Sequence, residues 1–117
     1  MILCDLMPTL GETMAETDSF SAKMQKLQQM RVALVLLLSA ESSKLMSKQQ
    51  RVAGKEIEVM CAERDYAEQA QSADALRKIY AEDRIAKEAV AETEAEITRM
   101  EDVLAKIDAD IGAMCQS

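Results

Sequence analysis

The large apolar residues of this chain recur at alternating steps of three and four positions, the spacing that gathers them on one side of a helix. The spacing is most regular in the C-terminal third. There Ala86 and Thr93 occupy two of the apolar positions, and Asp83 is the one charged residue at such a position. The large residues of this seam are Leu76, Ile79, Val90, Ile97, Met100, Leu104, Ile107, Ile111 and Met114. A long seam with Glu- and Lys-rich flanks is typical of a coiled coil. We therefore predict an acidic helix over residues 76–114.

A first, basic helix is predicted over residues 17–66. Its apolar stripe is narrower, because polar residues occupy the companion positions and the register lapses at Arg31. The stripe comprises Phe20, Met24, Leu27, Leu34, Leu38, Leu45, Val52, Val59 and Tyr66, and its polar companions are Glu41, Lys48 and Lys55. Residues 1–16 contain Pro8 and Gly11 and show no helical period, so we expect a flexible N-terminal tail.

A reversal or kink is predicted at residues 67–75, a stretch with no large apolar side chain. The seven-residue series through Tyr66 does not continue onto Ile79, so the two helices cannot present one straight face to one partner. Ser72, with Asp74 behind it, is a suitable helix N-cap. The expected fold is all-α, a long helical hairpin or coiled coil of two antiparallel helices, completed by oligomerisation or a partner chain. One long or bent helix, and a three-helix arrangement that also turns near Gly54, remain alternatives.

Residues 32–38, the apolar block, are apolar on every side of a helix and are far too few to span a bilayer. A two-helix hairpin covers one side of each helix, so three or four of them stay in water unless another chain or the N-terminal tail covers them. Exposed patches of this kind usually mark interfaces. The predicted partner interface comprises Val32, Leu34, Val35, Leu37, Leu38, Leu45, Leu76, Ile79, Val90, Ile97, Met100, Leu104, Ile107 and Ile111.

Composition and charge support association between helices. The 117 residues include only three Gly, one Pro and three aromatic residues, which favours elongated helices over a conventional globular core. Residues 19–55 hold seven bases against one acid, whereas residues 56–117 hold sixteen acids against seven bases. Complementary potentials of this kind favour side-by-side packing, within a chain or between identical or different chains.

Candidate chemistry is sparse, so we expect no catalytic, cofactor-binding or metal-binding residues and no enzyme activity. The chain has no His, no phosphate-binding glycine motif and no aromatic residues among its basic ones, so we expect no nucleic acid or small-molecule substrate. Cys4, Cys61 and Cys115 are widely spread, and we expect them to be reduced. Without a signal peptide or a transmembrane helix, and with reduced cysteines, the expected location is cytoplasmic, and no membrane contact is expected.

An apolar block leading into Gln-, Lys- and Ala-rich helix, over roughly residues 24–114, resembles helical components of bacterial type III secretion systems. These are translocator and filament subunits and the small chaperones that shield them. The pattern equally resembles eukaryotic assembly and tethering subunits. The resemblance lies in composition and apolar pattern and not in a motif, so no residue role can be transferred from these proteins. We predict a non-enzymatic coiled-coil interaction subunit with a scaffold role; the alternative is a small helical chaperone that shields an aggregation-prone partner, for example of a bacterial secretion system.

Overall fold

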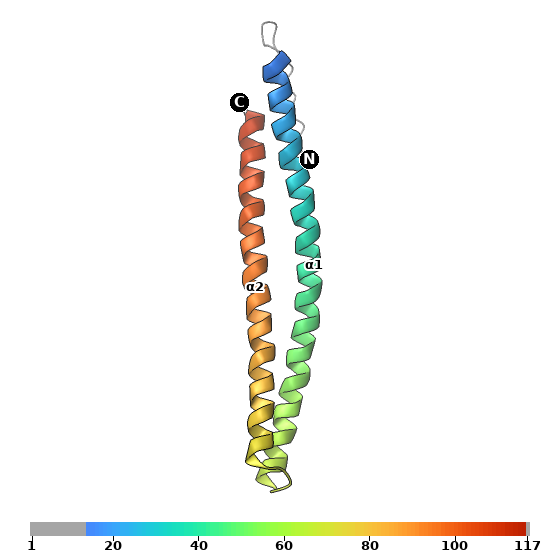
Figure 1. Cartoon of the computed structure of the whole chain (residues 1–117), viewed down its shortest axis with the longest axis vertical. Coiled ribbons are helices and arrows are strands. Elements are labelled where there is room, and N and C mark those ends of the chain that lie inside the picture. Colours follow the sequence, from blue (N-terminus) through green and yellow to red (C-terminus); the bar gives the residue numbers. More distant parts are fainter. Residues whose placement is uncertain (1–13, 117) are drawn as a thin grey trace. The chain divides into compact units, whose positions relative to one another are not determined.

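The structure is a computed structural model that describes residues 14–116, with side chains from residue 19. These residues form two helices, α1 (Met14–Ala67) and α2 (Ala73–Gln116), and no strand (Figure 1). They divide into two compact units. The first unit comprises residues 14–39 and 99–116, and the second comprises residues 40–98. Within each unit a stretch of α1 packs beside an antiparallel stretch of α2, so the predicted all-α fold with two antiparallel helices is confirmed.

Both helices extend further than their apolar periodicity. Helix α1 starts three residues before the predicted position 17 and ends one residue after position 66, while α2 starts three residues before position 76 and ends two after position 114. The end residues are compatible with helix but include no large side chain that keeps the apolar period, which explains the difference. Residues 1–13, the rest of the predicted tail, lie outside the described residues.

The chain reverses direction over residues 68–72, inside the predicted interval. The two alternatives are therefore wrong: the helix is not continuous, and Gly54 lies within α1 and makes no turn. At the end of α1 the Ala70 N–H donates to the Asp65 carbonyl (2.8 Å) and the Gln69 N–H to the Tyr66 carbonyl (2.9 Å). This is the Schellman arrangement, which satisfies carbonyls that the helix leaves unpaired.

Helix α2 begins with the N-cap that the sequence predicted. The Ser72 side-chain oxygen accepts a hydrogen bond from the Ala75 N–H at 3.2 Å. An Asp74–Arg77 ion pair occupies the first turn, where a negative charge interacts favourably with the helix dipole. The turn and the cap together fix where the chain leaves α1 and enters α2.

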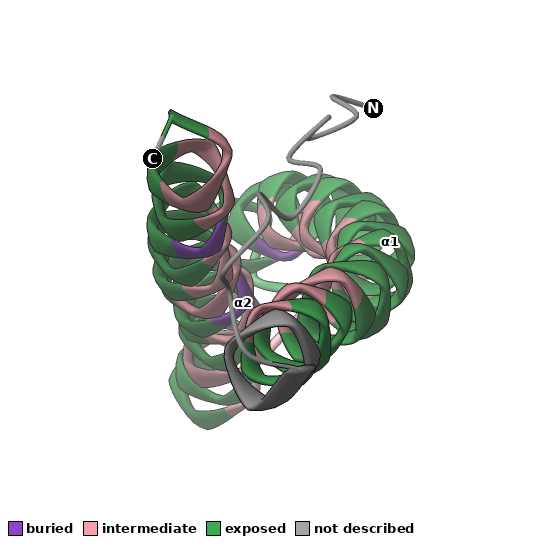
Figure 2. Cartoon of the chain, turned by 90° about the horizontal axis from the view of Figure 1, so that it is seen from above, coloured by how far each residue is buried: buried purple, intermediate pink, exposed green. Residues whose placement is uncertain are grey.

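Each unit has a thin core, because two helices bury one stripe each. Small side chains are the buried ones in the second unit, where Ala62, Ala86 and Thr93 are 2–5% exposed, and Ile107 is buried in the first unit. Figure 2 shows buried and half-buried residues along one side of each helix and exposed residues over the rest. Most of the helical surface therefore faces away from the contact.

Gln69 provides a test of the turn. Its φ of 61° lies in the left-handed region, where glycine avoids the steric cost that a side chain carries. We expect Gln69→Gly to stabilise the chain by about 0.5–1 kcal/mol and to raise the midpoint of thermal unfolding measured by circular dichroism. The neighbouring substitution Glu68→Gly, at a residue without a positive φ, is the control and should give no gain. Equal effects of the two glycines would contradict the assigned turn.

Candidate protein-interaction surfaces

Most residues of the predicted partner interface lie between α1 and α2 of the same chain. In the second unit Leu45 of α1 and Leu76, Ile79, Val90 and Ile97 of α2 are half-buried. In the first unit the same holds for Leu34, Leu38, Met100, Leu104 and Ile111, and Ile107 is buried. These side chains form the seam between α1 and α2 within their own unit. They therefore stabilise the hairpin and leave little surface for another chain.

The polar companions of the α1 stripe also belong to the seam of the second unit. Lys48 donates a hydrogen bond to the Thr93 hydroxyl oxygen (2.5 Å), and that hydroxyl donates to the Ala89 carbonyl (3.0 Å). The Lys55 ammonium group lies 3.1 Å from a Glu58 carboxylate oxygen and 3.8 Å from one of Glu82 on α2. Polar groups at a helix contact need such partners, and pairing them fixes the register of the helices.

Two charged residues that interrupt the apolar pattern also have partners. Arg31 in α1 pairs with Asp108 in α2 at 2.7 Å, within the first unit. Both side chains are 47% exposed, so the pair orients the helices more than it stabilises them. In the second unit Asp83 pairs with Lys87 at 2.9 Å, and this hydrogen bond and charge raise the pKa of Lys87. The other Asp83 carboxylate oxygen is buried without a partner.

The apolar block in the first unit is exposed to the extent that the sequence predicted. Of its six large residues, Leu34 and Leu38 turn towards the seam and the other four are exposed. Leu36 is 66% exposed and Val32 59%, with Leu37 and Val35 also in water. On the outer face, Val32 and Leu36 line a shallow hollow that contains no charged side chain. The hollow is lined by Gln25, Gln28, Gln29, Val32, Ala33 and Leu36.

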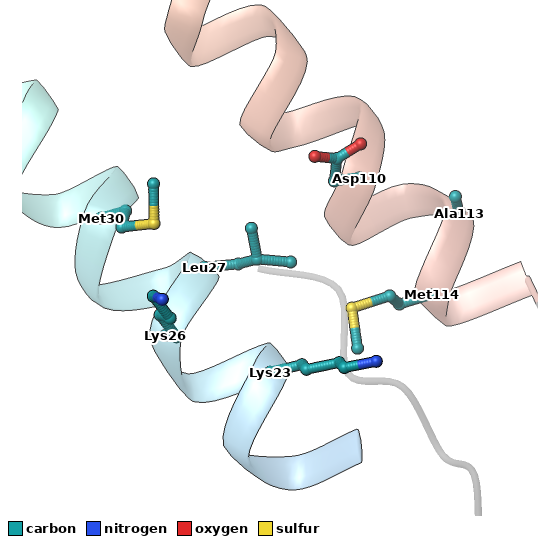
Figure 3. Close-up of a pocket in the computed structure, with 7 residues that line it drawn as sticks. All are labelled: Lys23, Lys26, Leu27, Met30, Asp110, Ala113 and Met114. Atoms are coloured by element: carbon teal, nitrogen blue, oxygen red, sulfur yellow. The ribbon is translucent and has the colours of Figure 1, made fainter. Parts of the chain in front are cut away.

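A second hollow in the first unit is a groove between α1 and α2 (Figure 3). Leu27 of α1 and Met114 of α2 point towards each other across it. Met30 and Ala113 extend the apolar lining, and the charged residues Lys23, Lys26 and Asp110 also line it. An apolar floor with a charged rim is the usual composition of a protein contact site.

Sequence reasoning missed a set of exposed apolar residues on α1 in the second unit. Met46, Ile57 and Met60 are 63%, 62% and 69% exposed. A signal was present in the sequence: positions 46, 53 and 60 are seven residues apart and keep a phase different from that of the seam. Among the residues whose side chains the structure describes, the other exposed large apolar ones outside the block are Met30, Tyr66, Tyr80, Ile85 and Val103.

The cysteines differ from expectation at one position. Cys61 is a free and exposed thiol, but Cys115 is disulfide-bonded, so the prediction of reduced cysteines is wrong for Cys115. The error arose because spacing along the sequence does not reveal which cysteines a fold brings together. Cys4 lies outside the described residues.

Two kinds of site are absent from the part of the chain that the structure describes. No group of three or more Cys, Asp or Glu side chains within residues 14–116 is arranged to hold a metal ion. Neither helix has, over these residues, an apolar segment long enough to cross a bilayer. No protein-family model, curated protein or solved structure matches this chain.

The pKa of Tyr80 depends on a contact between α2 and α1 in the second unit. Its hydroxyl donates to a Glu63 carboxylate oxygen at 2.7 Å and so links α2 to α1 within the second unit. That hydrogen bond, desolvation and the negative charge of Glu63 raise the pKa of Tyr80 above 10.0. Since the folded pKa exceeds the unfolded one, the interaction is fully present below the unfolded value and is lost as the pH rises through the folded value.

We therefore expect Tyr80 to form phenolate at higher pH than an unperturbed tyrosine. The measurement is the ultraviolet absorbance of phenolate during a pH titration of Tyr66→Phe, in which Tyr80 is the remaining tyrosine. Adding Glu63→Gln should lower the titration midpoint, because the carboxylate charge and a strong acceptor are removed. Identical midpoints with and without Glu63→Gln would show that α1 and α2 do not meet there.

Proposed function

We propose that this chain is a non-enzymatic protein-interaction subunit of a larger assembly, and that the apolar block of the first unit is the face it presents to another chain. The supporting observation is the exposure of Val32, Val35, Leu36 and Leu37 although both helices of that unit are already paired. Because α2 contacts the side of α1 that carries Leu34 and Leu38, these four side chains stay 41–66% exposed within the described part of the unit.

The free energy gained by burying these four apolar side chains is large enough to drive binding. Fully burying one such side chain contributes about 1.5–3 kcal/mol, and the four exposed ones retain roughly half of their surface in water. Covering them gains on the order of 3–7 kcal/mol before the entropic cost of association. This gain supports a specific contact when a few surrounding polar interactions add to it.

The charges around the block indicate the chemistry of its partner. Residues 19–39 of α1 carry Lys23, Lys26 and Arg31 and no acid. A partner that fits this surface is an amphipathic helix with an apolar stripe and acidic flanks, since unlike charges around an apolar contact steer association and suppress wrong pairings.

A scaffold role is preferred to the chaperone alternative because the polar seam contacts specify one pairing of α1 with α2, as a chain of fixed structure requires. A chaperone that exchanges its own helix for that of a client would be loosely folded alone. The predicted cytoplasmic location depended in part on reduced cysteines. Because Cys115 is disulfide-bonded, that argument does not hold for this chain.

The test is a pair of matched double substitutions in the full chain. Val32→Glu with Leu36→Glu places two charges on the exposed block. Ala105→Glu with Ala109→Glu places the same charges, at the same spacing, on the exposed side of α2 in the same unit. We expect the first pair to weaken association with the partner by at least about tenfold and the second pair to leave it nearly unchanged.

The measurement is quantitative co-purification from the native source, followed by mass spectrometry, with circular dichroism to confirm that both variants remain helical. A partner in fixed stoichiometry that is lost only with the block variant supports the proposal. Retention of that partner by the block variant, or loss of it with both helical variants, would count against the block as the interface.

A further inference from the structure

Cys115 is disulfide-bonded, and it stands near the C-terminal end of α2, next to a residue of the groove in Figure 3. It directly follows Met114, which lines that groove, and it is half-buried. The chain has three cysteines, and Cys61 is a free thiol. A disulfide bond within one chain joins two cysteines, so Cys4 is the one that remains for Cys115.

The chain before α1 is long enough for Cys4 to reach Cys115. Cys4 is ten positions before Met14, where α1 begins, and ten extended residues cover roughly 33–36 Å. Leu27 in the groove is thirteen positions after Met14, which is about 20 Å along the helix. Pro8 lies between Cys4 and the helix and favours a turn there. A segment that reverses at this point can therefore return to the groove with length to spare.

The composition of residues 1–13 fits the apolar lining of the groove. Leu27, Met30 and Met114 contribute its apolar side chains. Six of the thirteen residues in the segment are large and apolar, and they lie on both sides of Cys4. The six are Met1, Ile2, Leu3, Leu6, Met7 and Leu10. Packing them in the groove removes apolar surface of both partners from water.

The charges of the segment and of the groove are also complementary. Residues 1–13 carry Asp5 and Glu12 and no base. The rim of the groove carries Lys23, Lys26 and Asp110, a net charge of +1. Both lysines are exposed, and neither forms an ion pair with a described residue. Their positive charges are therefore available to an acidic segment, and unlike charges around an apolar contact favour one placement over others.

We infer that residues 1–13 of this chain pack in the groove of the first unit, held there by a disulfide bond between Cys4 and Cys115. The two thiols lose two protons and two electrons as the bond between their sulfur atoms forms. A low-molecular-weight disulfide such as oxidised glutathione takes them up, and its own sulfur–sulfur bond breaks to give two thiols. Leu3 and Leu6, on either side of Cys4, then lie over the apolar floor of the groove.

This inference is independent of the proposed function. The proposed partner surface consists of Val32, Val35, Leu36 and Leu37, none of which lines the groove. The groove takes a segment of the same chain, whereas the block takes another chain. Loss of the partner with the block variant and loss of the disulfide bond with a groove variant are therefore separate results.

Peptide mapping of the full chain without reducing agent tests the pairing of the cysteines. After equilibration with reduced and oxidised glutathione, Cys4 should be joined to Cys115 in chains that run as monomers on a denaturing gel. The control Cys61→Ser should give the same bond, because Cys61 is free. Cys115 joined to Cys61, to Cys115 of a second copy or to glutathione would overturn the inference.

The equilibrium constant of the bond against glutathione tests the packing of the segment, because it gives the effective concentration of the two thiols. A flexible linker gives about 1 mM, and a packed segment should give at least about tenfold more. Leu3→Asn with Leu6→Asn should lower the value at least about tenfold, since two apolar side chains are lost from the contact. Thr9→Asn is the control and should leave it nearly unchanged. A wild-type value of about 1 mM, or no decrease in the leucine variant, would overturn the packing.

Matched charge substitutions on α1 test where the segment lies. Lys23→Gln with Lys26→Gln removes two positive charges from the rim of the groove. Gln25→Glu with Gln29→Glu makes the same change in net charge at residues that line the other hollow. At low salt the lysine variant should lower the effective concentration at least about threefold and the glutamine variant should leave it nearly unchanged. Equal effects, with both variants helical by circular dichroism, would overturn the assignment to this groove.

Discussion

A helix that packs against a single neighbour can bury only one side of itself, and this constraint governs the structure. In each unit α1 and α2 bury one stripe against each other, and the buried residues among those described are few and mostly small. A core of that size gains little apolar free energy per residue ordered. Additional burial must come from outside the pair, and the apolar side chains that remain exposed on α1 are available for it.

Polar interactions give the pairing of the helices its specificity. The contact of Lys48 with Thr93, the contact of Tyr80 with Glu63 and the Arg31–Asp108 pair each join the two helices at one register. Such contacts are partly exposed or replace apolar contacts, so they add modest stability. Their effect is to disfavour shifted pairings, which an apolar stripe by itself would tolerate. The Schellman turn around Gln69 and the Ser72 cap act in the same direction by fixing the length of the connection.

The sequence was sufficient to predict the helices, the reversal and the exposure of the apolar block, because all three follow from periodicity along one chain. The seam positions from Leu76 to Ile111 were identified correctly by their spacing. The partners of Arg31 and of Lys48 could not be predicted, since they depend on the register of α1 against α2. The same limit applies to Cys115. The exposure of Met46, Ile57 and Met60 was missed, because the side of α1 that stays exposed depends on where α2 packs.

The direct test of uncovered apolar surface is the fluorescence of the dye ANS with the isolated full chain, at a concentration too low for self-association. Apolar faces that are exposed in the isolated chain should bind the dye and enhance its fluorescence, while circular dichroism shows intact helices. The account would be contradicted if the chain is helical and unfolds cooperatively but does not enhance the fluorescence of ANS at low concentration.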